Sequence, residues 1–247
     1  MEPGVNKHEL LANSIGLRLE HAQSRYFNIL SALVKPGCRW LEVGCGGQLV
    51  PDWSTPLHTQ SELASRPSLL VGIDVDSAIK HHPLLHHRVF ALGDHIPFAA
   101  DSFDIVSANM VVEHIEFPAK VFSEIHRVLA PGGIFLFHTP NHRNPVLLLA
   151  SLIPYSVKKK LVVRFFEDAR DEEDVFPTFY RANTTTAIRN AARASALAVE
   201  DVRVVGSVGF FNQLGALGYL EMFILKLHTL PLLRALDTNI IAVLKKA

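Results

Sequence analysis

Short apolar runs recur along the first half of this chain, and each is bounded by glycine, proline or polar residues. The first, Arg39–Val43, follows Pro36–Gly37 and leads into the glycine-rich stretch Gly44–Gly47. A buried strand that enters a tight turn is expected from this pattern. The same pattern predicts strands over residues 69–74, 88–92, 103–107 and 134–138.

Segments with helical periodicity separate these runs. Apolar residues recur at helical spacing from Val121 to Leu129, and the periodicity stops at Pro131–Gly133. Another helix is expected to begin at an Asn183 or Thr184 cap. Strands that alternate with helices favour an α/β fold with a parallel sheet. The remaining elements expected from the sequence are helices over 17–33 and 184–198 and strands over 199–205 and 239–244.

Two segments interrupt this alternation. Residues 141–181 combine an apolar piece, three lysines and an acidic piece, and we predict a lid-like insertion there. Residues 206–236 are apolar and predict a helical segment before the last strand, although their glycines and amides argue against a membrane span. This segment either packs on the sheet or a second subunit, or contacts a lipid-like acceptor at a membrane surface. One domain over 1–247 is expected from the length.

Charge and cysteine content narrow the class of protein. The 24 basic and 24 acidic residues balance, so no global field recruits nucleic acid. Only two cysteines occur, and Cys45 lies within the glycine-rich stretch, which favours a reducing, cytoplasmic setting. Met1–Ile15 lacks an apolar run of signal-peptide length, so secretion is not expected.

The residues just after the expected strands are the candidate site, because ligands of open parallel sheets bind beyond the carboxyl ends of the strands. Glycines after the first strand let the backbone approach a ligand, and Asp74 after the second can accept both hydroxyls of a ribose. These positions are Gly44–Gly47, Asp74, Gly93–Asp94, Ala108–Asn109 and Thr139–Asn141.

A nicotinamide-dependent oxidoreductase is one alternative for such a site. Its G-x-G-x-x-G pattern needs a third glycine where this chain has Leu49, and it expects an acidic residue about twenty residues further on. Here the stretch 51–67, interrupted by prolines, lengthens that connection. The first crossover helix is therefore expected to be short or displaced, and a pyrophosphate ligand fits poorly.

Taken together, the motifs resemble the class I S-adenosylmethionine-dependent methyltransferase family, especially its methyltransferase-11-like and ubiquinone/menaquinone methyltransferase-like branch. The resemblance covers about residues 25–247 and implies a Rossmann-like, seven-stranded, mostly parallel sheet flanked by helices, with an antiparallel last strand. The motifs are Leu41–Gly47, Gly72–Asp74, Gly93–Phe98, Asp101–Asp104, Glu113–Ile115 and Arg127–Gly133.

The resemblance also implies S-adenosylmethionine as cofactor. Asp74 would take the ribose hydroxyls and Asp94 the adenine amine, while Arg25 would meet either the cofactor carboxylate or a surface partner. The implied cofactor-binding residues are Arg25, Glu42, Gly44, Cys45, Gly46, Asp74, Val75, Asp94, His95, Asn109 and Met110.

The expected reaction is methyl transfer to a small-molecule or lipid-linked acceptor, at oxygen or carbon. An oxygen acceptor must lose a proton, and His114, expected at the start of the helix after the fourth strand, is the candidate base. The alternative for His114 is a structural role in helix capping or core packing. For the whole protein, a non-catalytic module that only binds the cofactor is a further alternative. The close histidines His81–His82 and His86–His87 are expected to be a solvated connector, so no metal site is predicted.

Overall fold

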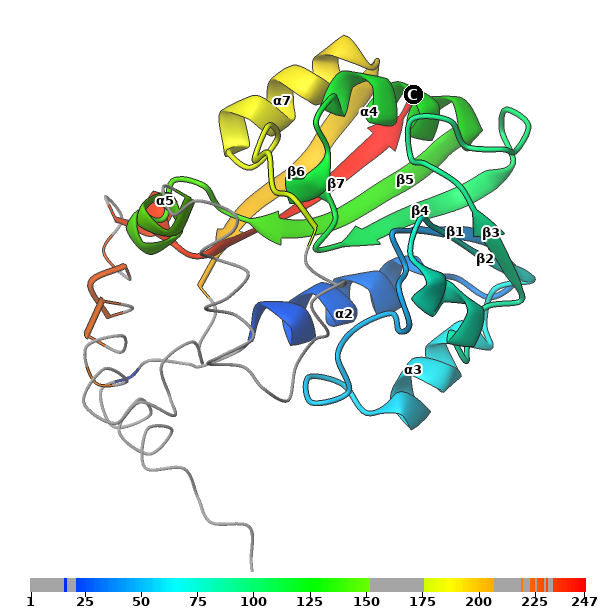
Figure 1. Ribbon diagram of the computed structural model, residues 1–247, viewed down its shortest axis with the longest axis horizontal. Coiled ribbons are helices and arrows are strands. Elements are labelled where there is room, and N and C mark those ends of the chain that lie inside the picture. The colour runs from blue at the N-terminus through cyan, green and yellow to red at the C-terminus, as the bar shows by residue number, and fades with distance from the viewer. Residues whose placement is uncertain are drawn as a thin grey trace, which may run out of the picture.

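The computed structural model describes residues 21–151, 176–206 and 233–247, together with residues 16, 219, 223–224, 226–228 and 230. Its strands lie side by side in a single twisted sheet (Figure 1). The strands are β1 Arg39–Val43, β2 Leu69–Asp74, β3 His87–Phe90, β4 Phe103–Asn109, β5 Leu129–Pro140, β6 Leu197–Val205 and β7 Asn239–Lys246. The helices are α2 Ala22–Leu33, α3 Leu57–Ala64, α4 Pro118–Val128, α5 Pro145–Ser151 and α7 Thr185–Ala194, with 3₁₀ turns η1 Ser77–His81, η2 Val112–His114 and η4 Arg234–Leu236.

The strand order confirms the predicted seven-stranded, mostly parallel sheet. The order is β3-β2-β1-β4-β5-β7-β6, and β7 runs antiparallel to both of its neighbours. The chain winds outward in opposite directions from the adjacent pair β1 and β4. Connections on the two sides of this pair therefore diverge, and a crevice is expected at the carboxyl ends of β1 and β4.

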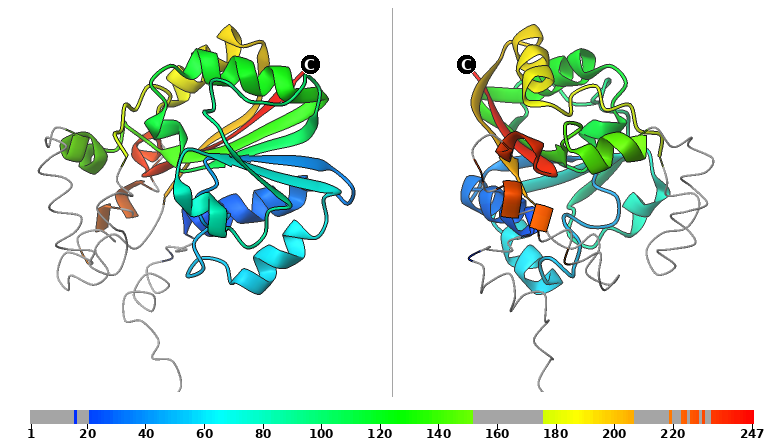
Figure 2. Two further views of the ribbon diagram at one scale, coloured as in Figure 1. Left: turned by 45° about the vertical axis from the view of Figure 1, so that its right-hand side comes forward. Right: turned by 90° about the vertical axis from the view of Figure 1, so that its left-hand side faces the viewer.

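Helices cover both faces of the sheet, and strand side chains alternate between two cores. Figures 1 and 2 show α4 and α7 on one face and α2 and α3 on the other. On β1, Trp40 packs in the core beneath α2, while Leu41 packs in the core beneath α4. This alternation is the period-two pattern of a strand that is buried on both faces.

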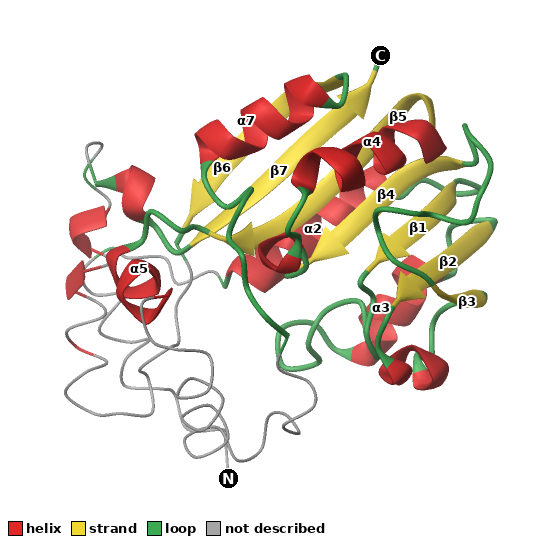
Figure 3. Cartoon of the chain, turned by 45° about the horizontal axis from the view of Figure 1, so that its top comes forward, coloured by secondary structure: helices red, strands yellow, loops and turns green. Residues whose placement is uncertain are grey.

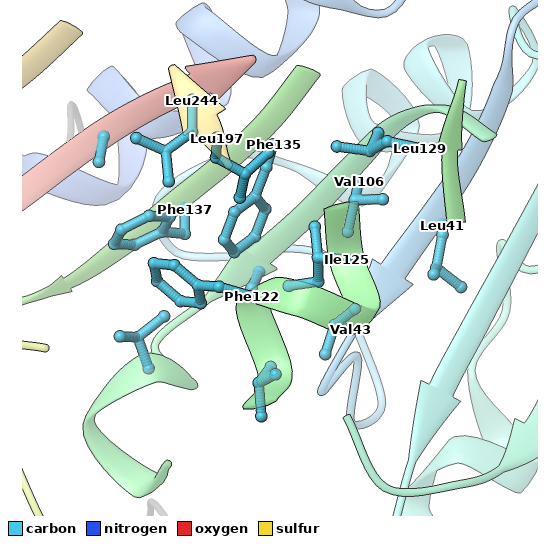
Figure 4. Close-up of a cluster of buried hydrophobic side chains, with 14 of the residues drawn as sticks. Leu41, Val43, Val106, Phe122, Ile125, Leu129, Phe135, Phe137, Leu197 and Leu244 are labelled. Atoms are coloured by element: carbon cyan, nitrogen blue, oxygen red, sulfur yellow. The ribbon is translucent and has the colours of Figure 1, made fainter. Parts of the chain in front are cut away.

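An aromatic cluster anchors α4 and the central strands. The Phe122 ring lies 5.3 Å from Phe135 and 5.7 Å from Phe137 between ring centroids, and all three side chains are fully buried. Figure 4 shows these rings meeting between α4 and β5. Burying a side chain of this kind stabilises the fold by about 1.5–3 kcal/mol, so the cluster fixes α4 against β5 in the core that also contains β4.

Two of the boundaries that differ from the sequence prediction have a clear structural cause. The strand predicted over 134–138 begins at Leu129, and Pro131–Gly133 form a bulge within it, because β5 pairs with Phe103 and Ile105 of β4 in different registers. The helix predicted to reach 198 ends at Ala194, since Ala196 adopts a φ of 55° and the chain reverses into β6. The cap itself is confirmed: the Thr184 side chain accepts from the amide of Ala187.

The predicted insertion and apolar segment fall largely outside the described residues. Of 141–181, residues 152–175 are not described, and α5 covers the apolar piece that precedes them. Most of 206–232 is likewise outside the description. Figure 3 shows α3, the short helix of the first crossover, which has eight residues. Within the described ranges, every helix falls short of the length and hydropathy needed to cross a membrane.

Candidate functional site

A pocket of about 720 Å³ opens at the carboxyl ends of β1, β2 and β4. Its wall comes from the glycine loop after β1, the residues after β2, the loop 91–94, the segment 109–117, and Phe176 and Phe179. The predicted site residues that line it are Glu42, Gly44, Cys45, Gly46, Asp74, Val75, Asp94, Asn109, Met110 and His114. Arg25 and His95 are not part of this wall.

The glycine loop brings backbone against the neighbouring strand end. Gly44 has a φ of +64°, and a Cβ there would lie 2.4 Å from a methyl group of Val111. Gly46 also has a positive φ, of +49°, but no heavy atom lies within 4 Å of the Cβ position. The space beside Gly46 is therefore open, as the approach of a ligand to the backbone requires.

Backbone amides orient the Asp74 side chain, and its oxygens can still accept hydrogen bonds from a ligand. Its Oδ2 accepts from the Gly46 amide at 2.7 Å, and its Oδ1 accepts from the Asp76 amide at 2.8 Å. An ionised carboxylate has about four lone-pair positions, so one on each oxygen remains for the hydroxyls of a ribose. The carboxylate is thereby oriented before any ligand binds.

Apolar side chains are exposed along the wall of the pocket. Val75 is 49% exposed, Leu92 60% and Phe117 55%, and all three line the wall. Exposed apolar side chains gathered in a concave site are typical of a surface that a flat apolar group covers. Sequence reasoning missed Leu92 and Phe117. The sequence predicts a strand that extends to Leu92, but β3 ends at Phe90, which places Leu92 on the ligand edge.

The loop that carries Asp94 is fixed by α4. Arg127 donates to the carbonyls of Phe98 and Ile96 at 2.7 and 2.8 Å, and Glu124 accepts from the Ile96 amide at 3.0 Å. The Arg127 guanidinium holds the pKa of Glu124 below its usual range. Asp94 itself is exposed at the pocket edge, and the His95 amide donates to the Leu92 carbonyl at 3.2 Å.

Glu42 is a buried carboxyl group in the pocket wall. The Ser107 hydroxyl donates to it, and the Trp40 indole nitrogen donates to Ser107. Burial raises the pKa of Glu42 from 4.5 to about 8, and these polar neighbours only partly oppose the rise. A cationic ligand group beside Glu42 would favour its ionised form.

His114 lies on the other side of the pocket, in the 3₁₀ turn η2 and not at the start of α4 as predicted, because α4 begins only at Pro118. Its Nδ1 lies 2.8 Å from the carbonyl oxygen of Pro177. A carbonyl only accepts, so this contact places the proton on Nδ1 and leaves Nε2 with a lone pair. Nε2 lies 4.0 Å from a carboxylate oxygen of Glu113.

The segment after the predicted insertion completes this wall. The amides of Phe179 and Tyr180 donate to the Glu113 carbonyl at 2.8 and 3.1 Å. Below them, Thr139 donates to the Glu113 carboxylate at 3.0 Å and accepts from Asn183 at 2.6 Å. Phe176 and Phe179 are each 39% exposed and line the pocket. Sequence reasoning missed both, since nothing local to them predicts contact with the turn at His114.

Arg25, which was expected at the site, and several other polar side chains lie outside the pocket wall. Tyr180 stacks on His142, with ring centroids 4.7 Å apart, and neither residue lines the pocket. Burial raises the pKa of Asp237, and the nearby charge of Arg25 is among those that oppose this rise, which places Arg25 on the Asp237 side. His82 is buried, and its Nδ1 accepts from the Leu84 amide. No group of side chains suited to hold a metal ion occurs among the described residues.

Comparison with known proteins decides the family. Residues 18–176, more than half of the chain, match a family model described as a methyltransferase domain. The chain belongs to this methyltransferase family. The family match and the sheet order confirm the predicted class and favour methyl transfer chemistry over the nicotinamide-dependent alternative.

Individual relatives agree with the family. A protein from Hahella chejuensis named Ubiquinone biosynthesis O-methyltransferase is 30% identical over 138 residues, 52% of this chain and 54% of that protein. One of the same name from Pseudomonas fluorescens is 28% identical over 178 residues, 67% of each chain. This chain spans about half the length of the first curated relatives that it matches. A solved S-adenosylmethionine dependent methyltransferase from Mesorhizobium loti shares the fold, with a TM-score of 0.55, 16% identity, and 89% and 96% of the two chains covered.

Proposed function

We propose that this protein transfers the methyl group of S-adenosylmethionine to an oxygen atom of a small-molecule or lipid-linked acceptor. The observation that carries the proposal is a single pocket with two different ends. One end has an oriented carboxylate, Asp74, and exposed apolar side chains. The other has the imidazole of His114, with an aromatic rim.

The residues at the first end fit the cofactor. Asp74 keeps acceptor positions for ribose hydroxyls, Val75 and Leu92 offer an apolar surface for adenine, and Gly46 leaves its backbone open to approach. Glu42 supplies a carboxyl group for the cation of the amino-acid part. When bound, S-adenosylmethionine supplies an activated methyl group on a sulfonium, so the task of these residues is alignment and desolvation.

Oxygen is the acceptor atom that His114 supports. With Nδ1 donating to Pro177, Nε2 can accept the hydroxyl proton of an acceptor that approaches this end of the pocket. Glu113 lies close enough to stabilise the resulting imidazolium. The names of the curated relatives, which are O-methyltransferases, also favour oxygen over carbon as the acceptor atom.

The rim of this end supports an aromatic acceptor with an apolar substituent. Phe117, Phe176 and Phe179 are exposed and line the pocket, and aromatic rings pack favourably against one another. On α5, Leu149 is 67% exposed, and the described part of the apolar segment exposes Phe223 at 60%. Such side chains suit a lipid-linked acceptor or a peripheral contact with a membrane surface.

Incubation of the purified protein with methyl-labelled S-adenosylmethionine tests the proposal. The acceptors are a set of catechols with and without a prenyl chain, and matched compounds whose hydroxyls are already methylated. We expect label on a free hydroxyl and none on the blocked compounds. Label on ring carbon would contradict oxygen transfer. If the protein binds the cofactor but transfers no methyl group to these acceptors or to a metabolite extract, the result would favour a non-catalytic binding module.

A further inference from the structure

Gln23 lines the pocket from the N-terminal helix, although no sequence motif marks it. It lies in the first turn of α2 and is only 7% exposed. Its Oε1 accepts from Nδ2 of Asn109 at 2.9 Å. Asn109 is the last residue of β4 and also lines the pocket. A buried amide at a helix start, beside the open end of the sheet, therefore faces the ligand space.

The orientation of the Asn109 amide is fixed by its other partner. Nδ2 of Asn109 also donates to the carbonyl of Leu49 at 3.2 Å, and a backbone carbonyl can only accept. Asn109 Oδ1 must then point the other way, where Nδ1 of His138 lies 2.9 Å from it. The proton of this contact belongs to His138.

His138 completes the chain of polar groups. It is 1% exposed, burial lowers its pKa to about 4, and its Nε2 lies 3.0 Å from Oδ1 of Asn239. A neutral imidazole carries one N–H. With this proton on Nδ1, His138 donates to Oδ1 of Asn109, and the Nε2 lone pair then calls for the nitrogen of the Asn239 amide in place of its oxygen. In this series of hydrogen bonds, His138 therefore donates to Asn109, and Asn109 donates to Gln23.

Because Gln23 accepts through its oxygen, the two N–H groups on its Nε2 are available to donate. Its oxygen is used by Asn109, and no residue within the described ranges accepts from its nitrogen. The first turn of an α-helix also favours negative charge. An amide donor in the pocket wall, on a side chain that is otherwise buried, predicts an anionic or carbonyl acceptor on the ligand.

The position of Gln23 indicates which part of the ligand it meets. Asp74 is the last residue of β2, on one side of β1, while Asn109 is the last residue of β4, on the other side. If the ribose lies at Asp74, the amino-acid part extends toward Asn109 and α2. Arg25, two residues further along the helix, lies outside the pocket wall.

We infer that Gln23 binds the carboxylate of the cofactor through its side-chain amide, and that His138 is a positioning residue that acts through Asn109. This inference rests on the proposed function, because it needs the cofactor in this pocket. The role that the sequence suggested for Arg25 passes to a neutral residue on the same helix.

Calorimetric titration with two ligands tests the inference. One is S-adenosylhomocysteine, and the other is its decarboxylated analogue, which keeps the amine but lacks the carboxylate. Gln23→Glu places like charges together, so we expect the affinity for S-adenosylhomocysteine to fall about 10- to 100-fold. Affinity for the analogue should be unchanged or higher. Asn28→Asp, which adds the same charge on the exposed side of α2, is the matched control.

If His138 positions Asn109, its substitution should cause a smaller loss of affinity that again affects S-adenosylhomocysteine and not the decarboxylated analogue. His138→Phe keeps a ring but cannot donate to Asn109, and we expect it to weaken S-adenosylhomocysteine several-fold while sparing the analogue. Gln23→Leu supplies a second test if Gln23→Glu lowers the melting temperature. Equal loss of both ligands, or selective loss in Arg25→Ala instead, would overturn the inference. Failure of the wild type to bind either ligand would overturn the proposed function.

Discussion

The two ends of the pocket are built from different kinds of sequence. The cofactor end comes from residues that directly follow β1 and β2, and its key contact joins Gly46 to Asp74, 28 residues apart. The acceptor end joins His114 to Pro177, 63 residues away, across the segment that includes residues 152–175. Strand ends of one sheet bring the first set together, whereas the second depends on how a returning segment docks. The two ends should therefore respond separately to mutation.

The largest expected effect separates chemistry from cofactor binding. His114→Ala should slow turnover by about a hundred- to ten-thousand-fold, the typical contribution of a general base. The affinity for S-adenosylhomocysteine should stay unchanged, because His114 lies at the acceptor end. Steady-state rates with a hydroxyl acceptor and calorimetry check the two halves. His87→Ala, an exposed imidazole on β3, is the control. A parental rate in His114→Ala across the neutral pH range would make this histidine structural.

Asp74→Ala should give the opposite pattern. Loss of two charge-assisted hydrogen bonds to the ribose should weaken cofactor binding by about 2–4 kcal/mol. Turnover at saturating cofactor should stay close to parental. Because Asp74 also accepts from Gly46 and Asp76, thermal melting must show a folded variant. Glu62→Ala on the exposed side of α3 serves as the control, and unchanged cofactor affinity in folded Asp74→Ala would remove this residue from the site.

Phe176→Ala sharpens the comparison at the acceptor rim. Loss of one aromatic contact, worth about 0.5–1.5 kcal/mol, should raise KM for an aromatic acceptor several-fold. KM for the cofactor should not change. The matched variant is Phe90→Ala, which removes an exposed ring from β3 outside the pocket. An equal rise in both KM values would mean that the two ends are not separable.

Glu42→Gln should change how stability depends on pH. Burial raises the pKa of Glu42 to about 8 in the folded protein from an ordinary 4.5, so the folded state keeps a proton that the unfolded chain releases in this window. The free energy of unfolding contributed by this group is therefore full below pH 4.5 and is lost as pH rises through 8.

Denaturant unfolding of the wild type and of Glu42→Gln at a series of pH values checks this sign. The difference between the two curves removes the contribution of the histidines, which both proteins share. We expect the wild type to lose stability relative to Glu42→Gln as the pH rises. Parallel curves would show that folding does not raise the pKa of Glu42.

The same contrast explains what sequence could predict. The strands, the glycine loop and Asp74 carry local signals, because buried strands need continuous apolar residues and tight approaches need glycine. Phe176, Phe179 and Gln23 carry none, since their place in the pocket depends on contacts with distant residues. The start of β5 was missed because Pro131–Gly133, which usually break a strand, form a bulge within it here. The family resemblance implies a cofactor contact for Arg25, but Gln23 on the same helix lines the pocket instead.

Calorimetric titration of S-adenosylhomocysteine into the wild type, Asp74→Ala and His114→Ala tests the central claim most directly. We expect one site per chain in the wild type, the same affinity in His114→Ala, and a binding free energy weaker by about 2–4 kcal/mol in Asp74→Ala. No binding to the folded wild type, or equal losses in the two variants, would contradict a pocket with separate cofactor and acceptor ends.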